Sequence, residues 1–111
     1  MPLEPIMGRV ILYALKVFED KLGVKDVSFR DLFTKIIVPL KERGFKTYEY
    51  EVDEDGNIKS SSFIEEMLFL EDNGLVKIRE KRVSLTEAGR KMACEEMIPR
   101  DLVSLINSLV K

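Results

Sequence analysis

Residues 62–91 read SFIEEMLFLEDNGLVKIREKRVSLTEAGRK, and the spacing of apolar side chains changes along this stretch. Apolar residues first recur at three- and four-residue steps, which predicts a helix over 62–73 that stops at Gly74. Two short apolar runs, 75–78 and 82–85, then flank a charged tip and predict a β-hairpin. The stretch therefore predicts a helix that leads directly into a two-stranded hairpin.

The helix predicted over 62–73 is expected to begin with a capping box. Ser62 and Glu65 have the required spacing, so that each side chain can accept from a free backbone amide. The face expected to be buried consists of Phe63, Ile64, Met67, Leu68 and Leu70. The face expected to point outward consists of Glu65, Glu66, Phe69, Asp72 and Asn73. This outward face is mostly acidic, and Phe69 is its aromatic exception.

After the hairpin, Thr86 is a typical cap for another helix that begins at Glu87 and that Pro99 interrupts. A last helical segment, 101–110, then carries one apolar stripe made of Leu102, Leu105, Ile106 and Leu109. This stripe either closes the core of a single domain or pairs with its counterpart in a second chain.

Two further helices are predicted before residue 62. The first covers 6–22 and carries two sets of apolar residues, so it is either central or covered on a second side by a partner. The second begins at Ser28, which forms a cap with Asp31, and Pro39 should kink or break it near position 38.

A change of period between 47 and 60 predicts an extra hairpin. Tyr48, Tyr50 and Val52 alternate with acidic residues, as in a strand, and Asp55-Gly56 is a strong signal for a tight turn. The fold class is therefore α+β, mainly α, with this hairpin before the third long helix and a C-terminal helix at the end.

The order of elements and two local motifs resemble the winged helix-turn-helix superfamily, in particular MarR- and PadR-type regulators. The motifs are Met67–Val76, which ends the third helix in a leucine-rich turn and glycine, and Leu85–Lys91, which leads into the next helix with the pattern leucine-threonine-glutamate-x-glycine. The resemblance is strongest over 62–91. It implies a single winged-helix domain over 1–111, in which the third helix is the recognition helix and the following hairpin is the wing.

Composition limits the chemistry that this chain can perform. The 111 residues include no histidine and one cysteine, Cys94, so the commonest general base, histidine-based zinc sites and internal disulfides are absent. We expect no enzyme activity, no cofactor and no metal, and we expect Cys94 to be a half-buried helical side chain. Glutamine and tryptophan are absent while lysine and glutamate are abundant, a bias that resembles proteins of hot-living organisms.

One acidic loop has some features of an EF-hand. The spacing of Glu51, Asp53, Asp55, Gly56 and Ile58 matches the first eight positions of such a calcium loop. The twelfth position is Ser62 where a bidentate glutamate is required, and the preceding segment is a predicted strand instead of a helix. An acidic turn without an ion is the better interpretation.

Two functions remain open. The resemblance and the basic wing predict a transcriptional regulator that binds duplex DNA through Lys59, Ser60, Ser61, Lys77, Arg79, Lys81 and Arg82. The acidic third helix favours a protein interaction module instead, with Tyr48, Tyr50 and Phe69 as its contacts. We also expect a homodimer formed by the N-terminal helix and residues 100–111, and a cytoplasmic location, because no signal peptide or apolar span is present.

Overall fold

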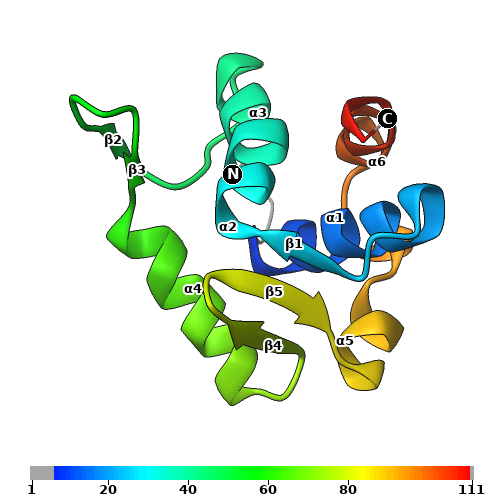
Figure 1. Ribbon diagram of the computed structural model, residues 1–111. Helices are drawn as coiled ribbons and strands as arrows, with labels where there is room; N and C mark the ends of the chain where they lie inside the picture. The colour runs from blue at the N-terminus through cyan, green and yellow to red at the C-terminus, as the bar shows by residue number, and fades with distance from the viewer. Residues whose placement is uncertain (1–6, 111) are drawn as a thin grey trace.

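The computed structural model describes residues 7–110, apart from the side chain of Met97. Its helices are α1 (Met7–Leu22), α2 (Phe29–Leu32), α3 (Val38–Glu42), α4 (Ser61–Asp72), α5 (Glu87–Met92) and α6 (Arg100–Leu109) (Figure 1). Its strands are β1 (Asp26–Ser28), β2 (Glu51–Val52), β3 (Ile58–Lys59), β4 (Val76–Arg79) and β5 (Arg82–Leu85). Two further helical turns complete the order of elements. They are a π-helical turn η1 (Phe33–Ile37), which is wider than an α-helix, and a 3-10 turn η2 (Glu95–Met97), which is tighter. The fold class is α+β and mainly helical, as predicted.

Helix α1 is the centre of the core. Its side chains are buried on nearly every side, from Val10 to Phe18 with the exception of Lys16. Helices α4, α5 and α6 and strands β1 and β5 all contact it. The second apolar set of this helix, which includes Leu12, Tyr13 and Val17, is therefore buried within one chain. Position 6, the predicted first residue of the helix, lies outside the described residues.

The second helical segment runs without interruption from α2 through η1 to α3. Ser28 caps it, since its hydroxyl accepts from the backbone N–H of Asp31 at 3.0 Å. Of the predicted kink or break near position 38, the break is wrong, because the helical segment continues through a π turn in which the N–H of Val38 bonds to the carbonyl of Phe33. Pro39 then falls in the first turn of α3, where a helix needs no N–H donor.

Strand β5 lies at the centre of a three-stranded antiparallel sheet of order β1-β5-β4. Val27, Val76, Val83 and Leu85 are buried and turn one face of the sheet toward the core. Strands β4 and β5 form the predicted hairpin, whose turn is only two residues long, Glu80 and Lys81. Sequence periodicity did not predict β1.

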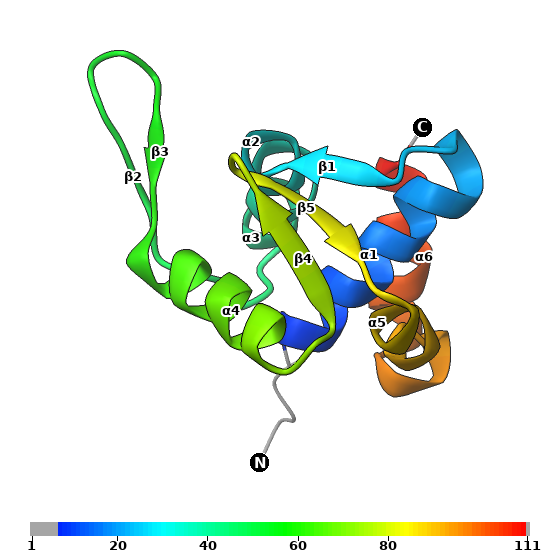
Figure 2. The same ribbon diagram turned by 60° about the horizontal axis from the view of Figure 1, so that its bottom comes forward.

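The extra hairpin exists but is much shorter than predicted. Only Glu51–Val52 and Ile58–Lys59 pair, with Val52 opposite Ile58. Figure 2 shows this hairpin standing clear of the body of the protein, beyond the N-terminal end of α4. Because it projects outward, only its base reaches the core.

Helix α4 begins at a different residue from the one predicted. Ser60 is the cap, because its hydroxyl accepts from the N–H of Phe63 at 3.3 Å and donates to the carbonyl of Glu49 at 2.5 Å. The predicted capping box of Ser62 and Glu65 is therefore wrong, and the helix starts at Ser61. The same bonds tie the start of α4 to the chain that enters the hairpin.

Thr86 caps α5, as predicted, and also joins two elements. Its hydroxyl accepts from the N–H of Gly89 at 3.0 Å and donates to the carbonyl of Gly74 at 2.6 Å. Gly74 has a φ of +73°, a conformation that glycine adopts at the end of a helix without strain. The hydroxyl thus fixes the end of the α4 segment against the start of α5.

The C-terminal stripe closes the core of this one chain. Leu102 and Ile106 of α6 are fully buried, and α6 contacts α1, η1 and η2. The α1 faces and the Leu102 and Ile106 positions of the stripe are therefore covered within the chain, whereas Leu105 and Leu109 are only partly buried, and the homodimer stays a prediction. Lys111, the last residue of the predicted dimerisation segment, lies outside them.

Candidate functional site

Helix α4 lies at one edge of the molecule, and its exposed side carries three large apolar side chains. Ile64, Leu68 and Phe69 are 42%, 50% and 59% exposed. Ile64 and Leu68 are four positions apart, so their side chains are neighbours along the helix, whereas Phe69 lies about 100° further round the exposed side. We call these three residues, together with the exposed carboxylates Glu65 and Asp72, the α4 outer face.

The prediction that Ile64 and Leu68 are buried is wrong. Only Phe63, Met67 and Leu70 of this helix are buried, toward α1 and β4. A helix at the surface buries only the stripe of side chains that faces the core, so the apolar residues on the other side of α4 remain exposed to solvent. Phe69 was expected to lie on the outward side of the helix, and its exposed fraction of 59% agrees with this prediction.

Three large apolar side chains exposed on one side of a helix are unusual on a protein surface. Single exposed leucines are common and carry no meaning, whereas a group of them marks a contact with another molecule. The aromatic ring of Phe69 is the type of side chain that concentrates binding energy in protein interfaces. The α4 outer face is therefore the strongest candidate for a binding surface among the described residues.

Acidic side chains are concentrated in the segment of the chain that contains this face. Residues 49–72, which comprise the hairpin and α4, carry nine acidic side chains and one basic one, Lys59. The remainder of the chain carries 17 basic and 11 acidic residues. The small net charge of -2 therefore conceals a division of the molecule into an acidic part and a basic part.

A cleft of about 950 Å³ lies between the two hairpins, and the α4 outer face continues out of it. Phe29, Phe33, Phe63, Ile58 and Ile64 supply its apolar lining. Five of the predicted nucleic-acid contacts also line it: Lys59, Ser60, Ser61, Lys81 and Arg82. The fold thus brings these five together, whereas Lys77 and Arg79 do not line the cleft.

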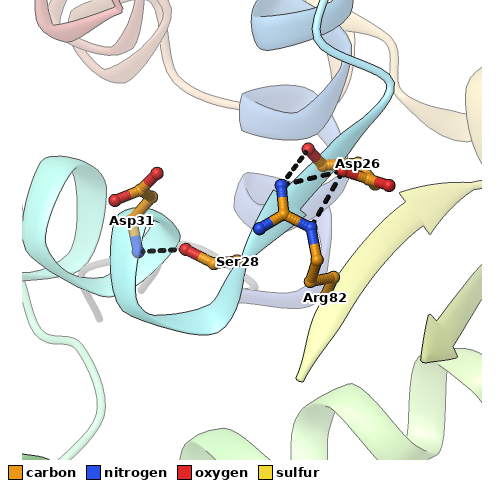
Figure 3. A network of polar contacts seen from close by, with 4 residues as sticks. All are labelled: Asp26, Ser28, Asp31 and Arg82. Carbon is orange, nitrogen blue, oxygen red and sulfur yellow. Dashed lines mark hydrogen bonds and ion pairs between the residues drawn. The ribbon is translucent and has the colours of Figure 1, made fainter. Parts of the chain in front are cut away.

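Arg82 is engaged within the protein. Its Nε and Nη2 atoms donate to one carboxylate oxygen of Asp26 at 3.0 and 2.8 Å, and Nη2 also donates to the carbonyl of Asp26 at 3.3 Å (Figure 3). This pair joins β1 to β5 across the sheet. A phosphate would have to compete with Asp26 for this guanidinium, so Arg82 is a weaker candidate contact than the sequence suggested.

The tip of the β4–β5 hairpin is held against α2. The N–H of Phe29 donates to the carbonyl of Lys81 at 2.9 Å. Glu80 and Lys81 both have positive φ angles, +51° and +60°, which is the two-residue turn geometry that suits tight hairpins but is costly for residues with side chains. The side chains of Lys77, Arg79 and Lys81 have no ion-pair partner within residues 7–110.

The two tyrosines proposed as partner contacts serve the core. Tyr48 is only 8% exposed and packs edge-on against Phe63, and half-buried Tyr50 packs edge-on against Phe33. Tyr48 therefore offers little surface to a partner, and its ring anchors the base of the hairpin. Its hydroxyl lies 3.3 Å from Oε1 of Glu66, and burial, followed by the charge of Glu66, raises the pKa of Tyr48 well above its usual range.

The acidic turn of the outer hairpin stabilises itself. Both carboxylate oxygens of Asp53 accept from its own loop, from the N–H groups of Asp55 and Asn57 and from the Asn57 side chain. The bond from the Asn57 N–H is the main cause that lowers the pKa of Asp53 below its ordinary value. Within residues 7–110, no cluster of three or more cysteine, aspartate or glutamate side chains is arranged to hold a metal ion.

Cys94 is exposed, which corrects the prediction of a half-buried helical side chain. It lies in the link between α5 and η2, where the helix has already ended. No helix in the described part of the chain is long and apolar enough to cross a membrane.

Comparison with known proteins identifies no relative. No family model, curated protein or solved structure matches this chain.

Proposed function

We propose that this protein is a winged-helix interaction module that binds another protein through the α4 outer face. The order of α4, the β4–β5 hairpin and α5 supports the winged-helix assignment, because it follows the order of recognition helix, wing and next helix. The pairing of β1 with β5 adds a third strand that fixes the wing to the body.

The observation that carries the proposal is the character of the exposed side of α4. In a DNA-binding winged helix this side enters the major groove, where it meets polar base edges and lies between phosphates. Here it presents Ile64, Leu68 and Phe69 beside Glu65 and Asp72, and α4 contains no lysine or arginine. Carboxylates repel phosphates, whereas an apolar patch gains free energy when a protein surface covers it.

Affinity capture tests this proposal. The wild-type protein and a Leu68→Ser, Phe69→Ser double variant would be immobilised and exposed to lysate of the native host, and the retained proteins would be quantified by mass spectrometry. We expect at least one protein that the wild type retains and the double variant loses. Met92→Ser is the matched control, because Met92 is also exposed, at 44%, but lies on α5. Equal retention by all three proteins would refute the proposed surface.

Duplex DNA remains a second candidate ligand because of the unpaired cations of the wing. Lys77, Arg79 and Lys81 are exposed, and three phosphate contacts would change the slope of log K against log salt by about 2.7. Binding of random duplex at about 50 and about 200 mM salt distinguishes the candidates. DNA would be favoured by an affinity that falls with salt and that is reduced in the triple variant Lys77→Ala, Arg79→Ala, Lys81→Ala. The double variant Leu68→Ser, Phe69→Ser should then bind DNA as the wild type does.

A further inference from the structure

We infer that the partner of the α4 outer face contributes a basic amphipathic helix, in which apolar residues are flanked by lysine or arginine. This inference rests on the proposed function and adds the chemistry of the partner. It combines three features of the described residues. These are the exposed apolar side chains of α4, the carboxylates beside them, and the backbone N–H and C=O groups in the middle of α4, which are already bonded within the helix.

The charges select a basic partner. Glu65 and Asp72 are exposed on the α4 outer face, and neither has a hydrogen bond or ion pair within residues 7–110. The hairpin beyond the N-terminal end of α4 adds exposed Glu51, Glu54 and Asp55. A partner that covers Leu68 and Phe69 therefore meets the carboxylates of Glu65 and Asp72, and positive side chains at its rim would lower the free energy of the complex.

Two arrangements of a second copy of this chain fit the face poorly. Two copies that paired through the same face would bring Glu65 and Asp72 of one chain to the same carboxylates of the other. A head-to-tail arrangement through the β4–β5 hairpin would offer Lys77, Arg79 and Lys81, which provide no apolar group to cover Phe69. The proposed occupant is therefore a different protein that supplies apolar and basic side chains together.

A helix suits this face better than an extended strand. The backbone groups of α4 are used within the helix, so a strand laid against it would find side chains in place of hydrogen-bond partners. A helix satisfies its own backbone, and its side-chain grooves accept the ridge formed by Ile64 and Leu68. The expected partner segment thus has apolar residues at i, i+3, i+4 and i+7.

Selection from a peptide library tests the inference. The probe is a phage-displayed library of helical peptides of about 18 residues, or about five turns, with fixed apolar residues at that spacing and flanking positions randomised among Lys, Glu and Ser. Peptides retained by the wild type and lost by Leu68→Ser, Phe69→Ser would be sequenced. We expect lysine to exceed glutamate about twofold or more at each flanking position, because exposed ion pairs stabilise a complex only weakly.

A charge-reversed protein provides the matched comparison. Selection on a Glu65→Lys, Asp72→Lys variant should reverse the preference, so that glutamate exceeds lysine. Equal numbers of lysine and glutamate on the wild type, or an excess of glutamate, would overturn the basic character of the partner.

The library and the lysate capture distinguish two further failures. A library without any peptide that depends on Leu68 and Phe69 would overturn the helical occupant, even where lysate capture still depends on these residues. Failure of the lysate capture as well would overturn the proposed function itself.

Discussion

The carbonyl oxygen of Leu75 occupies the space into which a side chain at position 89 would point. A Cβ atom on Gly89 would lie 1.9 Å from this oxygen, far inside van der Waals contact. The same oxygen accepts from the N–H of Thr86 at 3.1 Å, so it is fixed in place. The glycine of the leucine-threonine-glutamate-x-glycine motif therefore permits α5 to approach the turn that precedes β4.

Gly89→Ala should destabilise the protein by about 2–3 kcal/mol, since either α5 or the backbone at Leu75 must move. Thermal unfolding should show a fall in Tm of about 10 °C. Gly8→Ala is the control. A Cβ there would lie 3.4 Å from Oε1 of Glu66, which is ordinary contact, and α1 gains the better helix former. An unchanged or raised Tm for Gly89→Ala would contradict the close approach.

Thr86→Val should cost about 1–2 kcal/mol, because it removes both the cap of α5 and the bond to the carbonyl of Gly74. Thr86→Ser keeps the hydroxyl and should retain most of the stability. Urea unfolding of the two variants beside the wild type measures the difference. Similar losses for valine and serine would show that packing of the methyl group, and not the hydroxyl, stabilises this junction.

The raised pKa of Tyr48 predicts a loss of stability at alkaline pH. The neutral phenol is favoured in the folded state, so its contribution is complete below the ordinary tyrosine pKa of about 10 and is lost as pH rises above that value. The free energy of unfolding should fall above pH 10 by up to about 1.4 kcal/mol per pH unit from this group. Urea titrations at several pH values measure the slope.

Tyr48→Phe should remove that slope while it retains the aromatic packing against Phe63. At neutral pH the variant should lose about 1 kcal/mol, the net value of a hydrogen bond, because the hydroxyl no longer reaches Glu66. Identical alkaline slopes for the wild type and Tyr48→Phe would contradict the buried phenol.

The sequence predicted the long elements well because their signals are local. The signals for α1, for the Ser28 and Thr86 caps, for strands β4 and β5 and for the stop at Gly74 each depend on residues within a few positions of one another. Strand β1 escaped prediction because three residues, Asp26–Ser28, are too few to show alternation.

The composition of the candidate site depended on tertiary packing, which local patterns do not contain. Helix α4 has apolar residues on more than one side, and only its contacts with α1 and β4 decide that Met67 is buried while Leu68 is exposed. Likewise, the partner of Arg82 is Asp26, which is 56 positions away in the sequence. The cluster of basic residues was visible in the sequence, whereas the ion pair between Arg82 and Asp26 was not.

The central claim is that the exposed side of α4 contacts a protein, and photo-cross-linking from position 69 tests it most directly. A photoreactive phenylalanine analogue would replace Phe69 in one protein and Met92 in a second, and both would be irradiated in the native host. We predict a protein adduct from position 69 that is absent from position 92 and that Leu68→Ser reduces. An adduct to DNA at position 69, or equal adducts at both positions, would contradict the claim.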